Sequence, residues 1–211
     1  MRLLELFSGT GSMGHAFAAH GWEVVSLDKD PKTDATIRED ILTWDHTTYP
    51  PGHFDAIWAS PDCTQYSNAP RGAKTPRNLV LADSLVERSL ALIAYYAPRA
   101  WFVENPQTGM LKGRPFMAGL PFVDVDYCVF GAKYKKRTRI WNNTLFSGSL
   151  CGGPGVCPHM CGRRHLHTAQ QGRNRDGEGG MYGSHFRRRD LHRIPEFLCE
   201  AVFSACCQHF T

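Results

Sequence analysis

The sequence predicts an α/β fold built on a doubly wound mixed sheet, and three observations support this. Its 211 residues are enough for one α/β domain with a substantial core. A hydrophobic fraction of 42% and a charged fraction of 21% are those of an ordinary globular protein. The N-terminal segment runs from an apolar strand through a glycine turn and a helix to a second apolar strand that ends in Asp28. This order is typical of the first βαβ unit of a doubly wound sheet.

The elements of this first unit follow from local signals. We predict a buried strand over residues 3–7, a glycine turn over 8–12 and a helix that continues through His20. Gly21 ends this helix, because glycine readily adopts the left-handed conformation of a C-cap. The second strand then covers 22–27.

The middle of the chain is predicted to supply two more strands and a long helix. Residues 54–59 and 100–104 are apolar runs of strand length. Between them, 78–96 carries leucine and isoleucine at helical spacing. Pro98 closes this helix, because proline cannot continue a helix.

The C-terminal part contains a closing strand pair, an insert and a last helix. We predict a hairpin-like pair from 123–129 and 139–141. Residues 147–190 are rich in Gly, Arg, His and Cys and poor in large aliphatic residues, so they cannot build a core of their own and form a loop or a metal-stapled insert. A final amphipathic helix covers 194–203, with Pro195 in its first turn.

Charge and cysteine usage limit the classes of function. The net charge is only +4, but arginines crowd the C-terminal part while acids lie mostly in the N-terminal part. This asymmetry suits a polyanionic partner on one face, and a solvated basic surface is the alternative. No apolar stretch can span a membrane and the N-terminus lacks the pattern of a signal peptide, so we expect an intracellular, reducing compartment, either cytoplasm or nucleus. The eight cysteines are then free thiols, metal ligands or a nucleophile.

A thiol and a carboxyl are predicted at neighbouring strand ends. Cys63 follows the strand 54–59, and Glu104 ends the strand 100–104. Because the carboxyl ends of parallel strands meet at one edge of a sheet, this nucleophile and this acid make a candidate active site. Alternatively, Cys63 packs as one of several buried cysteines and Glu104 holds a helix N-terminus.

A nucleotide cofactor is expected beside the first glycine turn. The turn has Gly-x-Gly spacing without a third glycine, and Asp28 at the end of the second strand can accept both ribose hydroxyls. Asp40 and Ile41 can bind an adenine edge through a carboxylate and an apolar face. These features leave NAD and S-adenosylmethionine both open, and Asp28 and Asp40 are alternatively surface carboxylates. The expected cofactor-binding residues are Phe7, Ser8, Gly9, Thr10, Gly11, Ser12, Asp28, Lys29, Asp40, Ile41 and Ser60.

Several motifs in a fixed order resemble the cytosine-5 DNA methyltransferases. The resemblance covers residues 3–141 well and 192–204 weakly. It implies one catalytic domain over 1–211 with the Rossmann-like sheet of S-adenosylmethionine-dependent methyltransferases, and DNA as partner. The motifs that carry it are Phe7-Ser8-Gly9-Thr10-Gly11, Asp28, Asp40-Ile41, Ser60-Pro61-Asp62-Cys63, Glu104-Asn105-Pro106 and Arg137-Thr138-Arg139.

The resemblance also implies a covalent mechanism. Cytosine C5 is a poor nucleophile until a thiolate, here from Cys63, adds to C6 and makes C5 able to attack a methylsulfonium. A Glu104 that burial keeps protonated donates to N3 of a base flipped out of the helix. Arg139 contacts O2 of the ring, and Arg137 positions the loop or Cys63 itself.

The chain departs from the usual family pattern at several positions. Asp62-Cys63-Thr64 replaces Pro-Cys-Gln, Glu104-Asn105-Pro106 replaces Glu-Asn-Val, and Lys135 replaces a glutamine. The Asp62 anion is expected to raise the pKa of the neighbouring thiol. The 147–190 insert stands where typical members have a large target-recognition domain.

The insert carries a candidate zinc site. Three thiolates and an imidazole suit tetrahedral zinc, and a metal would stabilise a segment that has no core. His159 and His167 compete as ligands, and a disordered loop with free cysteines is the alternative. The polar and basic segments 170–173 and 186–189 are predicted to form a reduced recognition element. The expected ligands are Cys151, Cys157, Cys161 and His165.

Three other functions compete with a DNA cytosine-5 methyltransferase. An RNA cytosine-5 methyltransferase acting on tRNA would need the same residues. A non-catalytic DNA-binding regulatory homologue would have kept the fold, although retention of the thiol, the acid and the arginine together argues against it. An amino-group methyltransferase needs a second proline and an aromatic residue where this chain has Asp62 and Cys63.

Overall fold

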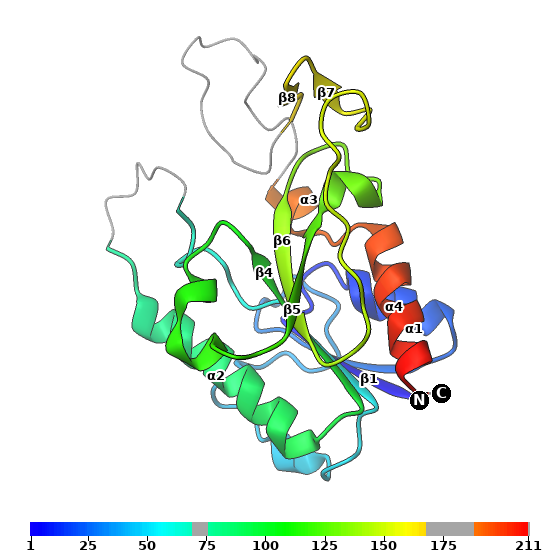
Figure 1. Ribbon diagram of the computed structural model, residues 1–211. Coiled ribbons are helices and arrows are strands. Elements are labelled where there is room, and N and C mark those ends of the chain that lie inside the picture. The colour runs from blue at the N-terminus through cyan, green and yellow to red at the C-terminus, as the bar shows by residue number, and fades with distance from the viewer. Residues whose placement is uncertain (69–75, 168–187, 211) are drawn as a thin grey trace.

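The computed structural model describes residues 1–68, 76–167 and 188–210 (Figure 1). Within this part of the chain, a six-stranded sheet has the order β2-β1-β3-β4-β6-β5. The first four strands in the sequence are parallel, while β6 runs antiparallel to both β4 and β5. The predicted mixed sheet is therefore confirmed. Its strands are β1 (Arg2–Leu6), β2 (Glu23–Leu27), β3 (Ala56–Ala59), β4 (Ala100–Pro106), β5 (Phe122–Asp126) and β6 (Arg137–Asn142).

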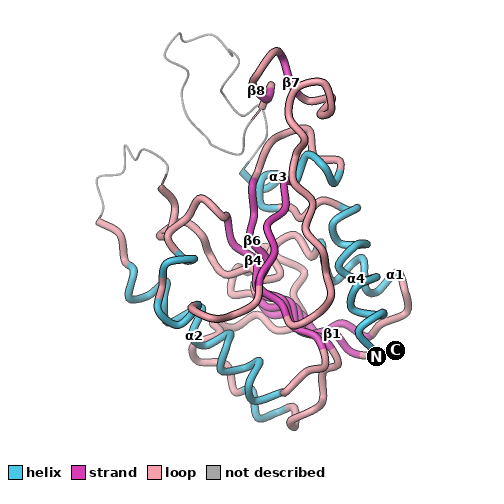
Figure 2. The backbone as a smooth tube through the Cα atoms, in the orientation of Figure 1, coloured by secondary structure: helices cyan, strands magenta, loops and turns pink. Residues whose placement is uncertain are grey.

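Helices cover both faces of this sheet (Figure 2). The helix α2 lies on one side, and α1 and α4 lie together on the other (Figure 1). Short 3₁₀ helices connect the main elements. The α-helices are α1 (Ser12–Ala19), α2 (Leu79–Tyr96), α3 (Arg188–His192) and α4 (Glu196–Phe210), and the 3₁₀ helices are η1 (His46–Thr48), η2 (Leu111–Gly113), η3 (Pro115–Met117) and η4 (Tyr127–Phe130).

The sheet separates two apolar cores because successive residues of a strand point to opposite faces. Leu3, Trp58 and Phe102 pack toward α1 and α4. Their sequence neighbours Leu4 and Ile57 pack toward α2. Strands buried on both faces explain why the first strands are continuous apolar runs rather than alternating ones.

The structure corrects the boundaries of several predicted elements. The long helix begins one residue later than predicted, because Asn78 is its N-cap and accepts a hydrogen bond from Leu81 N–H. The strand predicted over 123–129 ends at Asp126, where the 3₁₀ helix η4 begins. The last helix begins after Pro195 and continues to Phe210.

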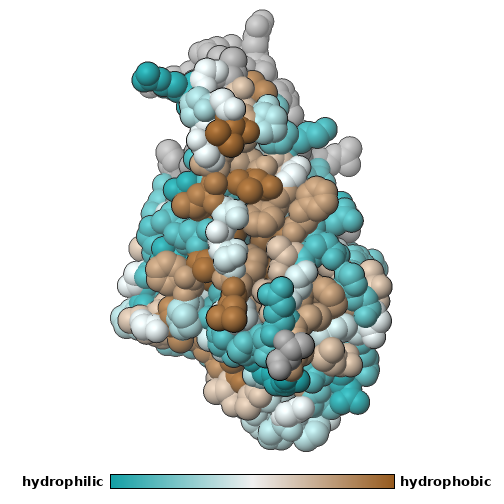
Figure 3. Space-filling model, turned by 45° about the vertical axis from the view of Figure 1, so that its right-hand side comes forward, coloured by the Kyte–Doolittle hydropathy of each residue, from teal (hydrophilic) through white to brown (hydrophobic). Residues whose placement is uncertain are grey.

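The insert predicted over 147–190 contains a short antiparallel pair, β7 (Met160–Cys161) and β8 (Arg164–His165). Residues 168–187 lie outside the described residues, and so do segment 170–173 and residues 186 and 187 of segment 186–189. No helix in the described ranges is both long and apolar enough to cross a membrane. Large apolar side chains, among them Leu145, Val156 and Phe197, are nevertheless exposed, and Figure 3 shows apolar patches on one face of the molecule.

Glu5 is a buried carboxyl at the start of α1. It lies in β1 at 3% exposure, and its Oε1 accepts a hydrogen bond from Met13 N–H at 3.2 Å. Burial raises the pKa of Glu5 to about 7, although backbone donors of Gly14 and Met13 oppose this shift. Gly14 packs closely beside it, and a Cβ at that position would force the Glu5 carboxyl to move, because it would lie 2.5 Å from Oε2.

We expect Glu5 to make stability depend on pH. Its pKa of about 7 in the folded state lies above the ordinary value of 4.5, so its stabilising contribution is complete below the ordinary value and is lost as pH rises through about 7. In the wild type, the free energy of unfolding should fall by about 3 kcal/mol between pH 4.5 and 8 because of Glu5. Glu5→Gln should not show this fall, measured by urea unfolding across this range. The exposed Glu39→Gln is the control, and an unchanged pH slope in Glu5→Gln would contradict the assignment.

Candidate active site

The turn between β1 and α1 exposes backbone at the carboxyl end of β1. Phe7, Gly9 and Gly11 have left-handed φ values of 58°, 52° and 67°. Ser8 N–H donates to Leu27 O at 3.2 Å, which holds the turn against the end of β2. Gly11 is the N-cap of α1 and provides no side-chain cap. The turn therefore allows the close approach of a ligand to its peptide groups.

Asp28 lies at the end of β2, next to this turn. One carboxylate oxygen accepts a hydrogen bond from Gly9 N–H at 2.8 Å, and the other accepts one from Asp30 N–H at 2.8 Å. Each oxygen of a carboxylate has a second lone pair, so Asp28 can still accept from a ribose hydroxyl. The structure thus brings the glycine turn and Asp28 together as predicted.

The other expected cofactor residues surround the same edge of the sheet. Lys29 Nζ lies 3.4 Å from Asp40 Oδ2, and Ile41 beside it is buried. On the other side of β1, Ser60 N–H donates to Leu6 O at 3.2 Å. Because β1 lies between β2 and β3, the residues at these three strand ends form one continuous edge. Their contacts with a cofactor stay a prediction.

The last helix returns to this edge. Ile194 N–H donates to Ser12 Oγ at 3.3 Å, and Ser12 Oγ lies 2.7 Å from Thr10 Oγ1. Helix α4 packs along α1. The segment that follows the insert in sequence therefore fixes the start of α1 and the glycine turn.

Cys63 lies in the loop after β3, and neighbouring elements hold this loop. Asn105 at the end of β4 donates from Nδ2 to Pro61 O at 2.9 Å. Tyr66 is fully buried, and its N–H donates to Cys63 O at 3.1 Å while its hydroxyl donates to Asp83 at 2.8 Å. Asn105 Oδ1 is buried and has no hydrogen-bond partner among the described residues, which leaves an acceptor beside the loop.

Burial raises the pKa of the Cys63 thiol above its ordinary value. The positive charge of Lys136 opposes this shift, whereas the charges of Glu104 and Asp62 add to it. Asp62 acts in the predicted direction but is a smaller cause than burial. Its Oδ1 accepts from Thr64 N–H at 2.8 Å, which forms a local turn beside the thiol.

Glu104 is buried near the end of β4, the strand next to the one that precedes Cys63. Its Oε1 accepts a hydrogen bond from the Tyr127 hydroxyl at 3.2 Å and lies 3.6 Å from Lys136 Nζ. Because β3 and β4 pair in parallel and Asn105 donates to Pro61 O, Glu104 lies next to the loop that carries Cys63. The thiol and the acid therefore follow neighbouring parallel strands, and a direct contact between them stays a prediction.

Arg137 begins β6 and holds the loop before it. Its guanidinium donates to both carboxylate oxygens of Asp126, at 3.0 Å from Nε and 2.7 Å from Nη2. Asp126 is fully buried and also accepts from Cys151 N–H at 2.9 Å. Of the two roles expected for Arg137, this geometry matches positioning of the loop rather than of Cys63.

Arg139 lies away from Glu104. It pairs with Asn105 in the register of β4 and β6, so it projects from the opposite face of the sheet to Glu104. Its guanidinium donates to both oxygens of Asp124, at 2.7 and 3.0 Å, and lies 3.5 Å from the centre of the Phe122 ring. The expected contact of Arg139 with O2 of a cytosine stays a prediction.

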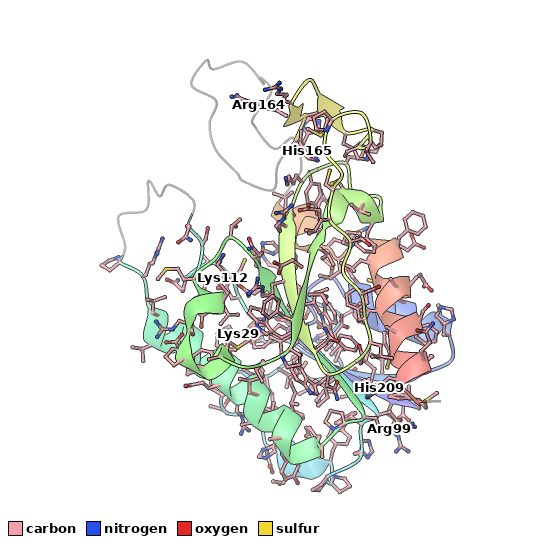
Figure 4. All side chains as sticks on the ribbon, in the orientation of Figure 1. Lys29, Arg99, Lys112, Arg164, His165 and His209 are labelled. Atoms are coloured by element: carbon pink, nitrogen blue, oxygen red, sulfur yellow. The ribbon has the colours of Figure 1, made fainter. Side chains whose placement is uncertain are left out.

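A cluster of sulfur and nitrogen ligands joins the insert to η4. His165 Nε2 lies 3.5 Å from Cys128 Sγ, 3.4 Å from Cys151 Sγ and 3.5 Å from Cys157 Sγ. All four ligand atoms lie within 4.8 Å of one another. His165 belongs to β8 at the end of the molecule beyond the sheet (Figure 4).

The cluster differs from the predicted ligand set in one member. Cys128 was not expected, because it lies outside the insert in sequence. Cys161 lies in β7, but its side chain is outside those that the structure describes. The predicted residues Cys151, Cys157 and His165 do come together.

Four residues of this region were missed by sequence reasoning, namely Asp126, Tyr127, Cys128 and Lys136. The predicted pairing of 123–129 with 139–141 contained a signal for them. In an antiparallel pair, the end of one strand faces the start of the next, so residues just after β5 must lie near those just before β6. Cys128 and Lys136 occupy these positions.

No protein-family model matches the chain. A protein of Frog virus 3 (isolate Goorha), described as a probable DNA (cytosine-5)-methyltransferase, is 35% identical to it, and the match covers 98% of this chain and 100% of that protein. This chain belongs to the DNA cytosine-5 methyltransferase family.

One more sequence relative and one solved structure are similar to this DNA cytosine-5 methyltransferase family member. The type II methyltransferase M.DdeI of Desulfomicrobium norvegicum is 26% identical over 50% of this chain and 28% of its own length. The crystal structure of a DNA modification methyltransferase encoded within an E. coli prophage matches with a TM-score of 0.50 and 16% identity, over 67% of this chain and 46% of that one. This chain thus matches about half of the solved structure. That likeness confirms the Rossmann-like methyltransferase fold.

We expect Asp126→Asn to destabilise the protein and loosen the loop before β6. Burial alone would raise the pKa of Asp126, but the hydrogen bonds from Arg137 and Cys151 N–H and the charge of Arg137 together lower it. Its carboxylate therefore stabilises the fold at any pH above the ordinary value of 3.8. Removing one partner of a buried pair should lower the free energy of unfolding by about 3 kcal/mol at pH 7, measured by urea unfolding. The exposed Asp34→Asn should change it by less than about 0.5 kcal/mol. Equal stability of the two variants would contradict the role of Asp126.

Proposed function

We propose that this chain transfers a methyl group from S-adenosylmethionine to C5 of cytosine in DNA. The single observation that carries the proposal is the placement of Cys63 and Glu104 at the neighbouring carboxyl ends of β3 and β4, next to the glycine turn that follows β1. In an open α/β sheet, ligands bind at this edge. Membership of the DNA cytosine-5 methyltransferase family supports the reaction and its substrate.

The edge of the sheet fits the cofactor. The left-handed Gly9 and Gly11 leave the turn without side chains near the peptide groups. Asp28 retains acceptor capacity for ribose hydroxyls, and Asp40 with the buried Ile41 offers a carboxylate and an apolar face to an adenine. When bound, the cofactor supplies an electrophilic methyl group.

Cys63 acts as the nucleophile in the proposed reaction. Its thiolate adds to C6 of a cytosine that has left the base stack, and the loop that Asn105 and Tyr66 hold fixes its position. Burial makes the thiolate costly to form, and the nearby charge of Lys136 offsets part of this cost. Glu104 would contact N3 and the 4-amino group of the ring, because it is the acid of the same site.

The two arginines have different proposed roles. Arg137 positions the wall of the site by holding Asp126. Arg139 would reach O2 of the base only by leaving Asp124, to which it now donates two hydrogen bonds. Arg139 is therefore proposed as a substrate contact that forms when the base enters.

A structural zinc ion is proposed at the cluster of Cys128, Cys151, Cys157 and His165. In tetrahedral geometry, a sulfur at about 2.3 Å and a nitrogen at about 2.0 Å from zinc lie about 3.5 Å apart. The three sulfur–nitrogen distances of 3.4 to 3.5 Å match this value. Thiolate ligands and the free state of the described cysteines both fit the expected reducing compartment.

We expect Cys63→Ser to abolish methyl transfer and to leave the affinity for S-adenosylmethionine within about twofold, because a serine hydroxyl cannot replace a thiolate. The wild type should also form a cofactor-dependent covalent adduct with a duplex that contains 5-fluorocytosine. Bisulfite sequencing of treated DNA then reads the methylated position and its context.

The partly exposed Cys207→Ser is the matched control and should keep full activity. Turnover by Cys63→Ser would overturn the covalent mechanism. An adduct on a 5-fluorocytosine RNA, with none on the DNA duplex, would instead assign the chain to RNA.

We expect purified protein to contain stoichiometric zinc, measured by mass spectrometry of the metal. Cys128→Ser should lose most of it, because three ligands remain in an open site. Cys161→Ser should keep it, which separates the cluster seen in the structure from the set predicted by sequence. Absence of zinc from the wild type, or loss in Cys161→Ser but not in Cys128→Ser, would contradict the proposed site.

A further inference from the structure

Lys136 is a cation with a largely covered side chain that lies against the acid of the active site. Its side chain is 12% exposed, and its Nζ lies 3.6 Å from Oε1 of Glu104, which is 6% exposed. The same ammonium lies 4.6 Å from the centre of the Tyr127 ring and 3.5 Å from its hydroxyl. Burial of a lysine is costly unless the charge is paired, so this placement requires the carboxyl and the ring.

The backbone around Lys136 is held in place on both sides. Tyr127 N–H donates to Lys136 O at 3.1 Å, and Lys135 N–H donates to His167 O at 3.0 Å. Arg137, the next residue, forms the two hydrogen bonds with Asp126. The ammonium is therefore aimed at Glu104 by the start of β6.

The other donors of this region are poorly suited to pass a proton to Glu104. Burial and the charge of Glu104 raise the pKa of Tyr127 well above its usual range, so its phenol stays neutral and only donates a hydrogen bond. Arg137 and Arg139 are each paired with an aspartate rather than with Glu104. An ammonium can give up its proton when a neighbouring carboxylate relays it.

We propose that Lys136 is the proton source of the reaction and acts through Glu104. This rests on the proposed cytosine-5 methyl transfer. The ammonium of Lys136 lies 3.6 Å from Oε1 of Glu104, so the carboxyl has a proton donor of its own beside it before the base enters.

The proton balance of the cycle follows from this arrangement. As the Cys63 sulfur bonds to C6, the electron pair of the C5–C6 double bond moves into the ring toward N3. Lys136 gives its proton to the Glu104 carboxylate, and Glu104 passes a proton to N3. C5 then bonds to the methyl group as the methyl–sulfur bond of the cofactor breaks. Loss of the C5 proton to solvent water and cleavage of the C6–sulfur bond restore the ring and the thiolate, and the N3 proton returns through Glu104 to Lys136.

Lys136 also acts on the nucleophile. Its positive charge lowers the pKa of Cys63, against the stronger effect of burial. One ammonium thus favours the thiolate before addition and supplies a proton during it. Loss of that proton during addition leaves Lys136 as a neutral amine. The amine no longer attracts the Cys63 thiolate, so this attraction does not oppose the bonding of the sulfur to C6.

The test uses single-turnover methylation of a cytosine duplex by Lys136→Met, Lys136→Arg and Lys136→Ala. We expect Lys136→Met to slow methyl transfer on the order of 100-fold, the usual effect of losing an acid, with cofactor and DNA affinity within about twofold of wild type. Lys136→Arg should stay slow, because an arginine keeps the charge but does not release a proton. Added ethylamine should restore Lys136→Ala in a concentration-dependent manner and leave Lys32→Met, an exposed control, unchanged.

A double variant tests the route through Glu104. Lys136→Met combined with Glu104→Gln should be no slower than Glu104→Gln alone, since both remove the same proton path. Full activity of Lys136→Arg, or no rescue of Lys136→Ala by ethylamine in a protein that unfolds at the wild-type temperature, would overturn the proposal. A wild type that forms no 5-methylcytosine would instead refute the proposed function itself.

Discussion

The pair between Arg137 and Asp126 is the interaction on which the rest of the site depends. It joins the last residue of β5 to the first residue of β6, and a fully buried carboxylate holds it. The same carboxylate accepts from Cys151 N–H, so one charge fixes both the sheet and the start of the insert. Lys136 precedes this arginine, and Tyr127 follows this aspartate.

This arrangement connects the proposed active site to the insert. Glu104 comes from a parallel strand, but its partners come from the turn between two antiparallel strands. Cys128 extends the same turn to the sulfur and nitrogen cluster of the insert. The insert and the acid of the site are therefore connected through only a few residues, and a metal in the cluster would stiffen that connection.

Much of the fold was predictable because its signals are local. The apolar runs, Gly21 as a helix end and Asn78 at the start of the long helix are properties of short segments. The gathering of the expected cofactor residues at one edge of the sheet was also predictable, since strand ends of parallel βα units meet by topology. The boundaries of β5 and the last helix were less predictable, because 3₁₀ turns and helix extension depend on packing against Gly131 and α1.

The sequence by itself determined the succession of strands and helices along the chain, the residues that follow the strands and the family to which these residues point. Only the tertiary structure decided the partners of these residues. It placed Lys136 beside Glu104, paired Arg139 with Asp124 and brought Cys128 to the ligands of the insert. Such contacts depend on strand register and on which face each side chain leaves, and a one-residue change in register reverses every face.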